Sequence, residues 1–255
     1  LRAAGITSLN TDLVYGLPHQ TLARIEDTID KVLTFAPDRV ALFGYAHVPW
    51  VSKRQKLIDE DALPGDLSRY HLARRAGERF VGAGLTSIGI DHFARPGDDL
   101  SKALEAGRLR RNFQGYTADS CQTLIGLGAS SISRLPGGYV QNAPATAAYK
   151  QRIAEGVFPG SRGYRMTLDD HLRARAIEQL MCTFALDLDD LSREFGPRAC
   201  ELLPCLNEMA ARFAPFTELT GRRITIAPDG RALTRMIASV LDQHVPDGVR
   251  YSRAS

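Results

Sequence analysis

Hydrophobic positions along the first half of the chain alternate between the spacing of strands and the spacing of helices. Residues 9–15 read Leu-Asn-Thr-Asp-Leu-Val-Tyr, which predicts a buried strand that carries one acidic residue. From residue 22 the apolar positions follow helical spacing as far as Pro37, and residues 39–45 predict a second strand. A strand, a helix and a strand in so short a span predict a right-handed parallel βαβ unit.

The acidic residue of the first strand, Asp12, is a candidate functional side chain. An unpaired carboxylate in a buried strand is costly unless a ligand or a partner compensates its charge. In chains that alternate strands and helices, ligand-binding groups are placed at the carboxyl ends of strands. The alternative is that Asp12 accepts backbone N–H groups in the turn before the helix.

The pattern becomes less regular further along the chain. A polar segment covers residues 52–65, and the following apolar positions predict a helix over 67–81 and a third strand over 85–90. Residues 91–139 no longer alternate cleanly and are rich in glycine. Long irregular stretches of this kind are usually functional, so we expect loops that approach a ligand closely.

The character of the sequence changes again after residue 160. Thr167 caps a predicted helix, and its first turn is acidic. Later patterns predict short helices, a hairpin and a last helix at residues 188–194, 197–212, 216–226 and 232–241. We therefore expect two domains, residues 1–160 and residues 161–255.

Composition and charge restrict the classes of protein to which this sequence can belong. The 255 residues are 44% hydrophobic and 24% charged, which is ordinary for a soluble globular protein. The net charge of +3 is too small to indicate nucleic acid or an anionic membrane. No apolar run is long enough to span a bilayer and no secretion leader is visible, so a cytoplasmic location is expected. Because the sequence starts at Leu1 in mid-pattern, we expect it to be the rear part of a larger enzyme.

Cysteines and histidines do not form a recognisable metal motif. The four cysteines match no zinc or redox spacing, so we expect free thiols. His47 and His92 both follow predicted strand ends, yet no histidine pair has ligand spacing, and no metal site is predicted. Asp91 and His92 are neighbours, and because neighbours on a strand point to opposite faces, a direct pair between them is not expected.

Five phrases of the sequence resemble one known family. They are Asn-Thr-Asp-Leu-Val-Tyr-Gly-Leu-Pro at residues 10–18, Tyr-Ala-His-Val-Pro at 45–49, Gly-Ile-Asp-His-Phe-Ala-Arg-Pro at 89–96, Arg-Asn-Phe-Gln-Gly-Tyr-Thr at 111–117 and Tyr-Val-Gln-Asn at 139–142. Their order and spacing are similar to those of the oxygen-independent coproporphyrinogen III oxidase (coproporphyrinogen dehydrogenase) family, within the radical S-adenosylmethionine superfamily. The likeness runs through nearly the whole chain.

The resemblance implies an α/β fold, the C-terminal half of a radical-SAM partial (β/α) barrel followed by a small, mostly helical, winged-helix-like domain. It implies oxidative decarboxylation of two propionates of coproporphyrinogen III to vinyl groups, giving protoporphyrinogen IX in haem biosynthesis by a 5′-deoxyadenosyl radical. The implied partners are coproporphyrinogen III and an electron donor such as a flavodoxin-type protein, with no nucleic acid and no membrane. The full-length protein is expected to be a monomer.

The implied cofactors are S-adenosyl-L-methionine and a [4Fe-4S] cluster. The family holds its cluster with a Cys-x-x-x-Cys-x-x-Cys motif, which is absent from this sequence. The cysteines at 121, 182, 200 and 205 cannot substitute, because three ligands must share one short loop. We therefore expect the cluster ligands in a missing N-terminal part, and no activity from this chain alone.

The resemblance also assigns site residues. Asp12, Ala46 and Ile132 are expected to bind S-adenosylmethionine, Ala46 through its main chain. Phe113 and Gln114 are expected beside the active site. Arg111 is our hypothesis for a clamp on substrate propionates, since guanidinium groups bind carboxylates in a forked geometry, and a surface salt bridge is its alternative. No catalytic residue is assigned.

Two other functions remain open at this point. A sister group of the same superfamily resembles haem chaperones, which bind haem without decarboxylating a substrate. A DNA-binding regulator is a more distant alternative, which the segment 197–212 disfavours because Arg198 and Arg212 are its only basic residues.

Overall fold

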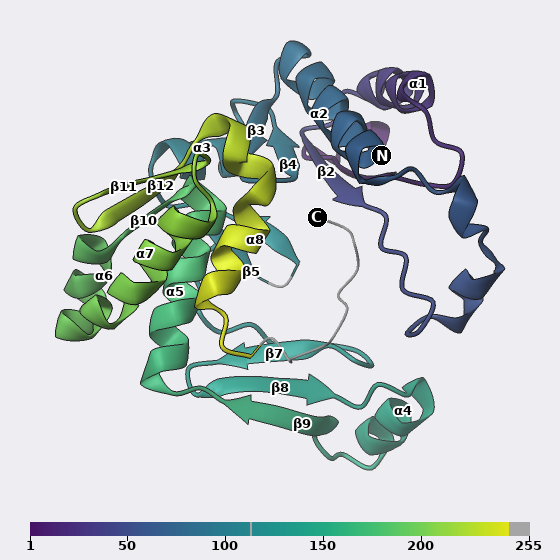
Figure 1. The fold of residues 1–255 in the computed structure, drawn as a ribbon. Helices are drawn as coiled ribbons and strands as arrows, with labels where there is room; N and C mark the ends of the chain where they lie inside the picture. Colours follow the sequence, from purple (N-terminus) through teal and green to yellow (C-terminus); the bar gives the residue numbers. More distant parts are fainter. Residues whose placement is uncertain (113, 245–255) are drawn as a thin grey trace. The chain divides into compact units, whose positions relative to one another are not determined.

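The computed structural model describes residues 1–112 and 114–244 (Figure 1). The chain forms two compact units, the first made of Leu1–Ala118 and Ile177–Ser255 and the second of Asp119–Ala176. The two domains expected from the sequence, 1–160 and 161–255, stay a prediction, and their boundary falls at the start of a strand in the second unit.

The βαβ pattern expected at the start of the first unit is present. Strand β1 (Asn10–Tyr15) is followed by helix α1 (Leu22–Leu33) and strand β2 (Arg39–Gly44). The two strands are parallel and in register from Asn10 opposite Arg39 to Tyr15 opposite Gly44. Helix α1 begins where the side chain of Thr21 accepts a hydrogen bond from the backbone N–H of Arg24.

The next part of the chain differs from the expected single strand over 85–90. After helix α2 (Asp66–Gly82), two short strands form, β3 (Thr86–Ile88) and β4 (His92–Ala94). The chain reverses between them with Gly89 at φ 56°, a backbone conformation that favours glycine. Strand β4 lies antiparallel to both β2 and β3, so the sheet order is β1-β2-β4-β3.

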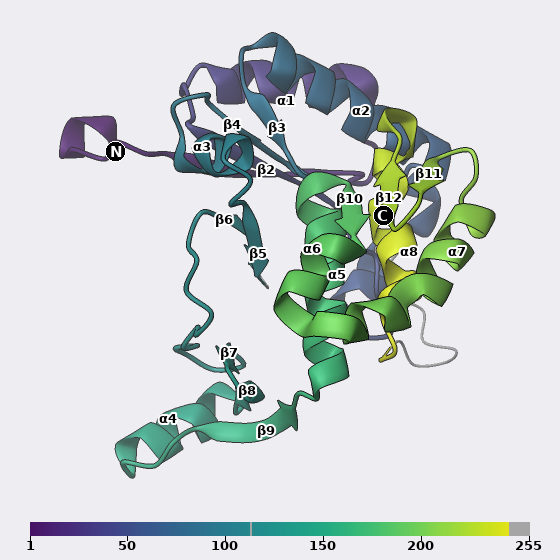
Figure 2. The ribbon, with the colours of Figure 1, turned by 90° about the vertical axis from the view of Figure 1, so that its left-hand side faces the viewer.

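One face of this sheet packs on helices α1 and α2 (Figure 2). The buried side chains of this core are Ile25, Ile29, Val40, Leu42, Leu72, Ala76, Phe80, Leu85 and Phe93, with Leu13 and Tyr15 packed against them. The expectation of a buried first strand is wrong, because exposed and half-buried residues alternate along β1. Strand β1 lies at one end of the sheet, and its residues that face away from α1 and α2 are exposed.

The remainder of the first unit is built from short elements. They are α3 (Asp99–Glu105), β5 (Arg110–Asn112), β6 (Gly115–Thr117), β10 (Ala185–Asp187), α6 (Leu188–Phe195), α7 (Leu203–Arg212), β11 (Thr217–Thr220), β12 (Arg223–Ile226) and α8 (Thr234–Ala238). Helix α5 (Leu168–Thr183) runs from the second unit into the first. Short 3-10 helices lie at Arg2–Ala4, Lys53–Leu57, Glu60–Ala62, Gly196–Leu202, Pro228–Leu233 and Ser239–Leu241.

The C-terminal part contains the expected hairpin and the expected helix over 188–194, whereas two other expected helices are divided. Strands β11 and β12 form the antiparallel hairpin predicted over 216–226, and β10 pairs with β12 to complete a three-stranded sheet. The segment 197–212 is a 3-10 helix followed by α7, with a proline in the first turn of α7. The segment 232–241 is likewise split, into the end of a 3-10 helix, α8 and a second 3-10 helix.

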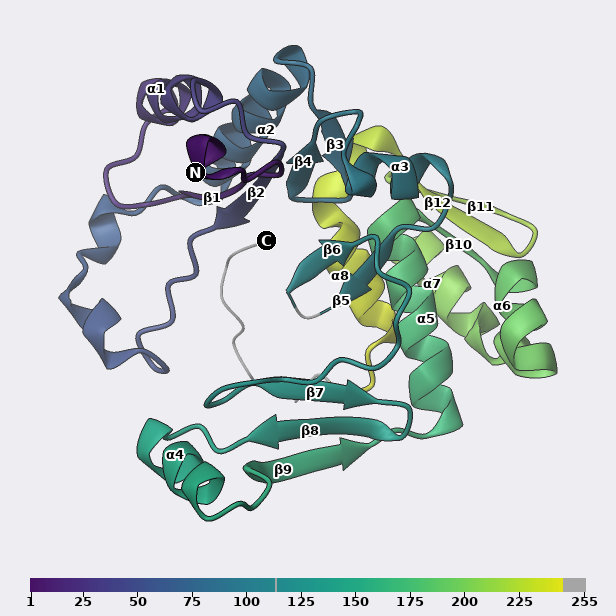
Figure 3. The same cartoon turned by 180° about the vertical axis from the view of Figure 1, so that it is seen from behind.

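The second unit is an antiparallel sheet of β7 (Ile132–Leu135), β8 (Gly138–Asn142) and β9 (Gly160–Arg165), with α4 (Thr146–Ala154) between β8 and β9 (Figure 3). The segment 91–139 is therefore more regular than expected, since it contains β4 to β7 and α3. Its strands are only three or four residues long, which is too short for a clear alternation of polarity.

Within residues 1–112 and 114–244, every helix is too short or too polar to span a bilayer.

Candidate functional site

Three residues on neighbouring strands form a row across the first sheet. Asp12 of β1 is paired in register with Ala41 of β2, and Ala41 is paired with His92 of β4. Register partners point to the same side of a sheet, so these side chains share one face. We call it the site face, and it is opposite to the face that packs on α1 and α2.

Asp12 lies on the exposed part of the site face. Its Oδ1 atom accepts a hydrogen bond of 2.9 Å from the side-chain amide of Asn10. The expectation that the Asp12 carboxylate is desolvated in a buried strand is therefore wrong, because this side of β1 is open to solvent. A solvated carboxylate with acceptor capacity to spare is suited to hydroxyl or ammonium groups of a ligand.

Asp91 and His92 form the direct pair that strand alternation argued against. The Nδ1 atom of His92 lies 2.6 Å from Oδ1 of Asp91. Alternation does not apply here, because β4 begins at His92 and Asp91 belongs to the preceding turn. The second carboxylate oxygen of Asp91 accepts a hydrogen bond of 2.8 Å from Nη2 of Arg235 in α8.

The imidazole of His92 is enclosed by aromatic rings. Its ring centroid lies 5.9 Å from that of Phe43 and 5.2 Å from that of Tyr116, both in edge-to-face arrangements. A Cβ atom at residue 115 would lie only 2.9 Å from Nε2 of His92, so Gly115 leaves the space that this ring edge needs. Nδ1 is engaged by Asp91, and the ring edge that carries Nε2 packs against Gly115, so His92 is buried within the site rather than open to solvent.

Tyr116 fixes this aromatic group to the rest of the unit. Its hydroxyl donates to the carbonyl of Met181 at 2.8 Å and accepts from the backbone N–H of Ile90 at 3.2 Å. Burial raises the pKa of the Tyr116 phenol far above its ordinary value, so the group stays neutral and acts as an anchor.

Arg111 lies beside the same ring. Its guanidinium carbon is 5.7 Å from the centre of Tyr116, and its Nε atom is buried without a hydrogen-bond partner. Within the described part of the chain, Arg111 forms no ion pair, and its neighbour Arg110 pairs with Glu178 at 3.0 Å instead. The described residues therefore do not form the surface salt bridge that was the alternative for Arg111.

The other predicted site residues are more scattered. The carbonyl of Ala46 accepts a hydrogen bond of 3.0 Å from the side chain of Gln55. Gln114 is exposed in the β5–β6 turn, and Ile132 begins β7 in the second unit. Phe113 lies outside the described residues. The roles assigned to these residues stay predictions.

In residues 1–112 and 114–244, no three histidine, cysteine, aspartate or glutamate side chains are grouped so as to hold an ion. Cys121 and Cys200 are exposed whereas Cys182 is buried. The donor set of this chain does not fit a cluster that needs three thiolates on one loop.

Sequence reasoning missed three contributors to the site. The Asp-His-Phe phrase drew attention to Asp91, but the pairing with His92 depends on where β4 begins. Tyr116 belongs to the phrase at residues 111–117, and nothing in its local pattern indicates that it anchors His92. Arg235 carried no local signal, because its partner is 144 positions away along the chain.

Comparisons with known proteins identify close relatives. No family model matches the chain. It is 56% identical over 256 residues to "Oxygen-independent coproporphyrinogen III oxidase" of Cereibacter sphaeroides, a match that covers all of this chain and 57% of that protein. It is 39% identical over 261 residues to the protein of the same name from Thermostichus vulcanus, covering 100% of this chain and 80% of that protein.

A solved structure shows the same fold. It is that of coproporphyrinogen III oxidase from Escherichia coli, a radical SAM enzyme. The TM-score is 0.88 at 33% sequence identity, over 96% of this chain and 57% of that chain. The chain thus spans a little over half the length of several relatives that it matches. Since the Thermostichus vulcanus relative is matched over most of its length, the chain belongs to the oxygen-independent coproporphyrinogen III oxidase family.

Proposed function

We propose that this chain supplies part of an enzyme that oxidatively decarboxylates two propionates of coproporphyrinogen III to vinyl groups, giving protoporphyrinogen IX. The observation that supports this function is the site face, where exposed Asp12 and His92, whose imidazole is held by Asp91, stand in one row across the sheet. The row occurs in a chain that is 56% identical to a protein named for that activity.

Asp12 fits a role in binding S-adenosylmethionine. One of its carboxylate oxygens is held by Asn10, and the exposed group can accept further hydrogen bonds from a ribose diol or an amine. When bound, S-adenosylmethionine would supply the radical chemistry. The cysteines of this chain do not fit the [4Fe-4S] cluster, so we place the cluster ligands in sequence that is not part of this chain.

Arg111 is suited to bind the substrate, and His92 to shape the wall beside it. Both lie against Tyr116, and the guanidinium of Arg111 can bind carboxylates such as propionates in a forked geometry. Asp91 holds the buried imidazole of His92 through Nδ1. A flavodoxin-type electron donor and a monomeric state complete the proposal.

The test is a chimera in which these 255 residues replace the matching part of the Cereibacter sphaeroides relative. Anaerobic conversion of coproporphyrinogen III, measured by chromatography of the oxidised products, is expected with the chimera. Replacing Asp12 with Asn is expected to lower S-adenosylmethionine affinity about tenfold, because one charge-assisted hydrogen bond is worth roughly 1.5–3 kcal/mol.

The matched control is Asp27→Asn, since Asp27 is an exposed carboxylate paired with Lys31 on the surface of α1. This variant is expected to behave like the unmodified chimera. A chimera that binds haem stoichiometrically but converts no coproporphyrinogen III would support the haem-chaperone alternative and refute the enzyme.

A further inference from the structure

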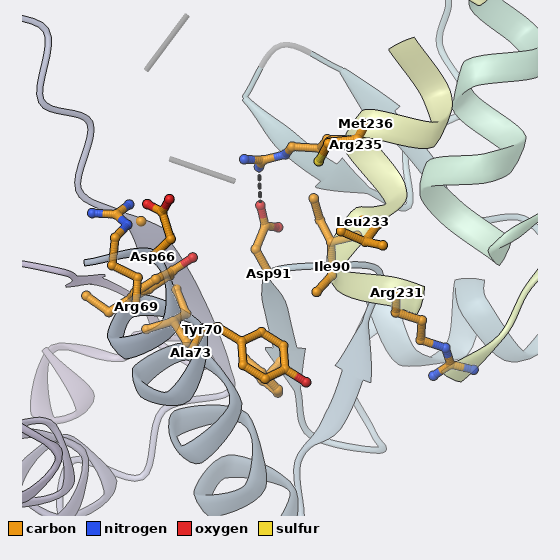
Figure 4. A pocket seen from close by; sticks show the side chains of 15 residues that line it. Asp66, Arg69, Tyr70, Ala73, Ile90, Asp91, Arg231, Leu233, Arg235 and Met236 are labelled. Carbon is orange, nitrogen blue, oxygen red and sulfur yellow. Dashed lines mark hydrogen bonds and ion pairs between the residues drawn. The ribbon is translucent and has the colours of Figure 1, made fainter. Parts of the chain in front are cut away.

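A cavity of about 300 Å³ lies on the other side of the first sheet from the site face (Figure 4). Its floor is formed by Tyr15, Leu42 and Phe93, whose side chains point away from the row of Asp12, Ala41 and His92. Its walls come from α2 and from the segment that leads into α8. All of these residues belong to the first unit.

Arg69 of α2 brings an unpartnered cation to this cavity. Its guanidinium carbon lies 5.8 Å from the centre of the Tyr15 ring, and its Nη2 atom is buried without a hydrogen-bond partner. A Cβ atom at Gly16 would lie 2.6 Å from Nη1 of Arg69, so the glycine leaves the space that the guanidinium occupies. A buried charged N–H group without an acceptor is costly, which points to an anion as its missing partner.

A second arginine reaches the cavity from the other side. Figure 4 shows Arg235 approaching from α8 and joined to Asp91, while Arg69 comes from α2. One guanidinium nitrogen of Arg235 is engaged by Asp91, which leaves its other N–H groups for a ligand. Arg69, Arg235 and the phenol of Tyr15 thus line one cavity, together with Arg231, whose guanidinium stacks on the ring of Phe184.

The acidic and apolar residues that line the cavity favour an anion with a single negative charge. Asp66 and Asp91 also line the cavity, and they offset much of the positive charge of the arginines. The remaining lining is largely apolar, including Leu42, Ala73, Ile90, Leu233 and Met236. A single negative charge on an apolar body is complementary to this arrangement, whereas a phosphate dianion is less so.

We propose that this cavity binds a small monocarboxylate with an apolar body, whose oxygens accept hydrogen bonds from Arg69 and Arg235. The cavity shares Asp91 and Arg235 with the site described above, whereas Arg69 and Tyr15 line the cavity alone, and the proposal does not depend on the function proposed above. A free monocarboxylate and a single propionate arm of a porphyrin share this chemistry, and competition between them distinguishes the two sources.

The test is titration calorimetry of the 255-residue chain with 3-phenylpropionate, compared with the neutral 3-phenylpropanamide. Binding of the acid alone is expected. Arg69→Gln replaces the guanidinium with a neutral, shorter polar group and is expected to weaken binding about tenfold, through loss of a charge-assisted hydrogen bond. Arg74→Gln is the matched control, because Arg74 lies on the same helix, pairs with Glu78 and does not line the cavity.

Ala73→Leu provides a second variant that leaves both arginines in place. It fills the cavity and is expected to abolish binding, with the circular dichroism spectrum unchanged; if Arg69→Gln does not fold, this variant decides the result. Equal binding of the amide, or unchanged affinity in either variant, would overturn the proposal. Coproporphyrin III that competes with 3-phenylpropionate would support a propionate arm as occupant, and lack of competition would support a free monocarboxylate.

Discussion

Arginines that pair with carboxylates far away in the sequence organise the first unit at the scale of single residues. Arg39 donates to Asp98 at 2.7 Å, and the side chain of Asp98 is only 5% exposed. Arg110 pairs with Glu178, and Arg235 with Asp91. The guanidinium group suits this purpose because it presents several donors in a fixed plane and keeps its charge when partly buried. These pairs connect segments that the hydrophobic pattern treats separately.

Asp38 provides a prediction about pH at this scale. Its carboxylate accepts hydrogen bonds from the backbone N–H of Leu9 at 2.7 Å and from Arg2 at 2.5 Å, and these bonds hold its pKa below the ordinary value. The folded pKa is lower than the unfolded pKa, so the carboxylate contributes stability at neutral pH that is lost as pH falls through the folded pKa. Asp38→Asn is expected to lower the free energy of unfolding by about 1 kcal/mol at pH 7.

Urea unfolding at several pH values checks this prediction. The difference between Asp38→Asn and the parent should shrink once the pH falls below the ordinary aspartate value of about 3.9. Asp27→Asn removes an exposed carboxylate of α1 and should show no such trend. A difference that stays constant down to pH 2.5 would contradict the assignment.

Site residues were predictable only where one local pattern specified them. Asp12 stood out because it is an acidic residue in an apolar strand, and the structure places it on the site face as a strand residue. The pairing of Asp91 with His92 could not be predicted, since it depends on the strand starting one residue later than Asp91. Arg235 could not be predicted either, because sequence periodicity contains no information about partners 144 positions apart.

At the scale of elements, length decided which predictions succeeded. Strands β1 and β2 have six residues each and α1 has twelve, long enough for their polar and apolar positions to reveal the period. Strands β3 and β4 have three residues each, so the pattern merged them into one strand and missed the reversal at Gly89. The last predicted helix failed similarly, because α8 has only five residues between two 3-10 helices.

Asn142, at the end of β8, provides a prediction at the scale of elements. It is 7% exposed, and its side-chain amide donates to the carbonyls of Gly126 and Gly128, both at 3.0 Å. These bonds attach the loop before β7 to the sheet of the second unit. Asn142→Asp removes both donors and leaves two half-buried carbonyls without these bonds, so we expect a loss of about 1–3 kcal/mol in stability of this loop.

Hydrogen exchange of the backbone amides is the measurement. Exchange should accelerate in the loop around residues 126–131 and remain unchanged in β1 and β2. Gln151→Ala, which alters an exposed amide of α4 that donates to Glu155, is the control and should leave the loop protected. Unchanged exchange in Asn142→Asp would show that other contacts hold the loop.

At the scale of the whole molecule, the outer edge of β1 is the exposed feature of the first sheet. Among the strands that the structure describes, β1 pairs only with β2, and Val14 on it is 40% exposed. Unpaired strand edges favour pairing with other chains. We expect concentration-dependent self-association of the 255 residues, and Val14→Lys should reduce it, because a lysine on an edge strand opposes such pairing.

Light scattering over a range of protein concentrations measures this effect, and chemical unfolding should show a change of less than about 0.5 kcal/mol. Val81→Lys is the matched control, since Val81 is an exposed valine on α2 rather than on a strand. Equal reduction by both variants would mean that added charge, and not the strand edge, controls association.

The ion pair between Arg235 and Asp91 has a consequence for the order in which the protein is made. The ribosome synthesises the first sheet and α2 well before α8, because the partners are 144 residues apart. Contacts of such high sequence separation form late, after the nearer ones have closed their loops. A nascent chain that has not yet reached Arg235 therefore lacks this ion pair, and any product truncated before Arg235 lacks it permanently.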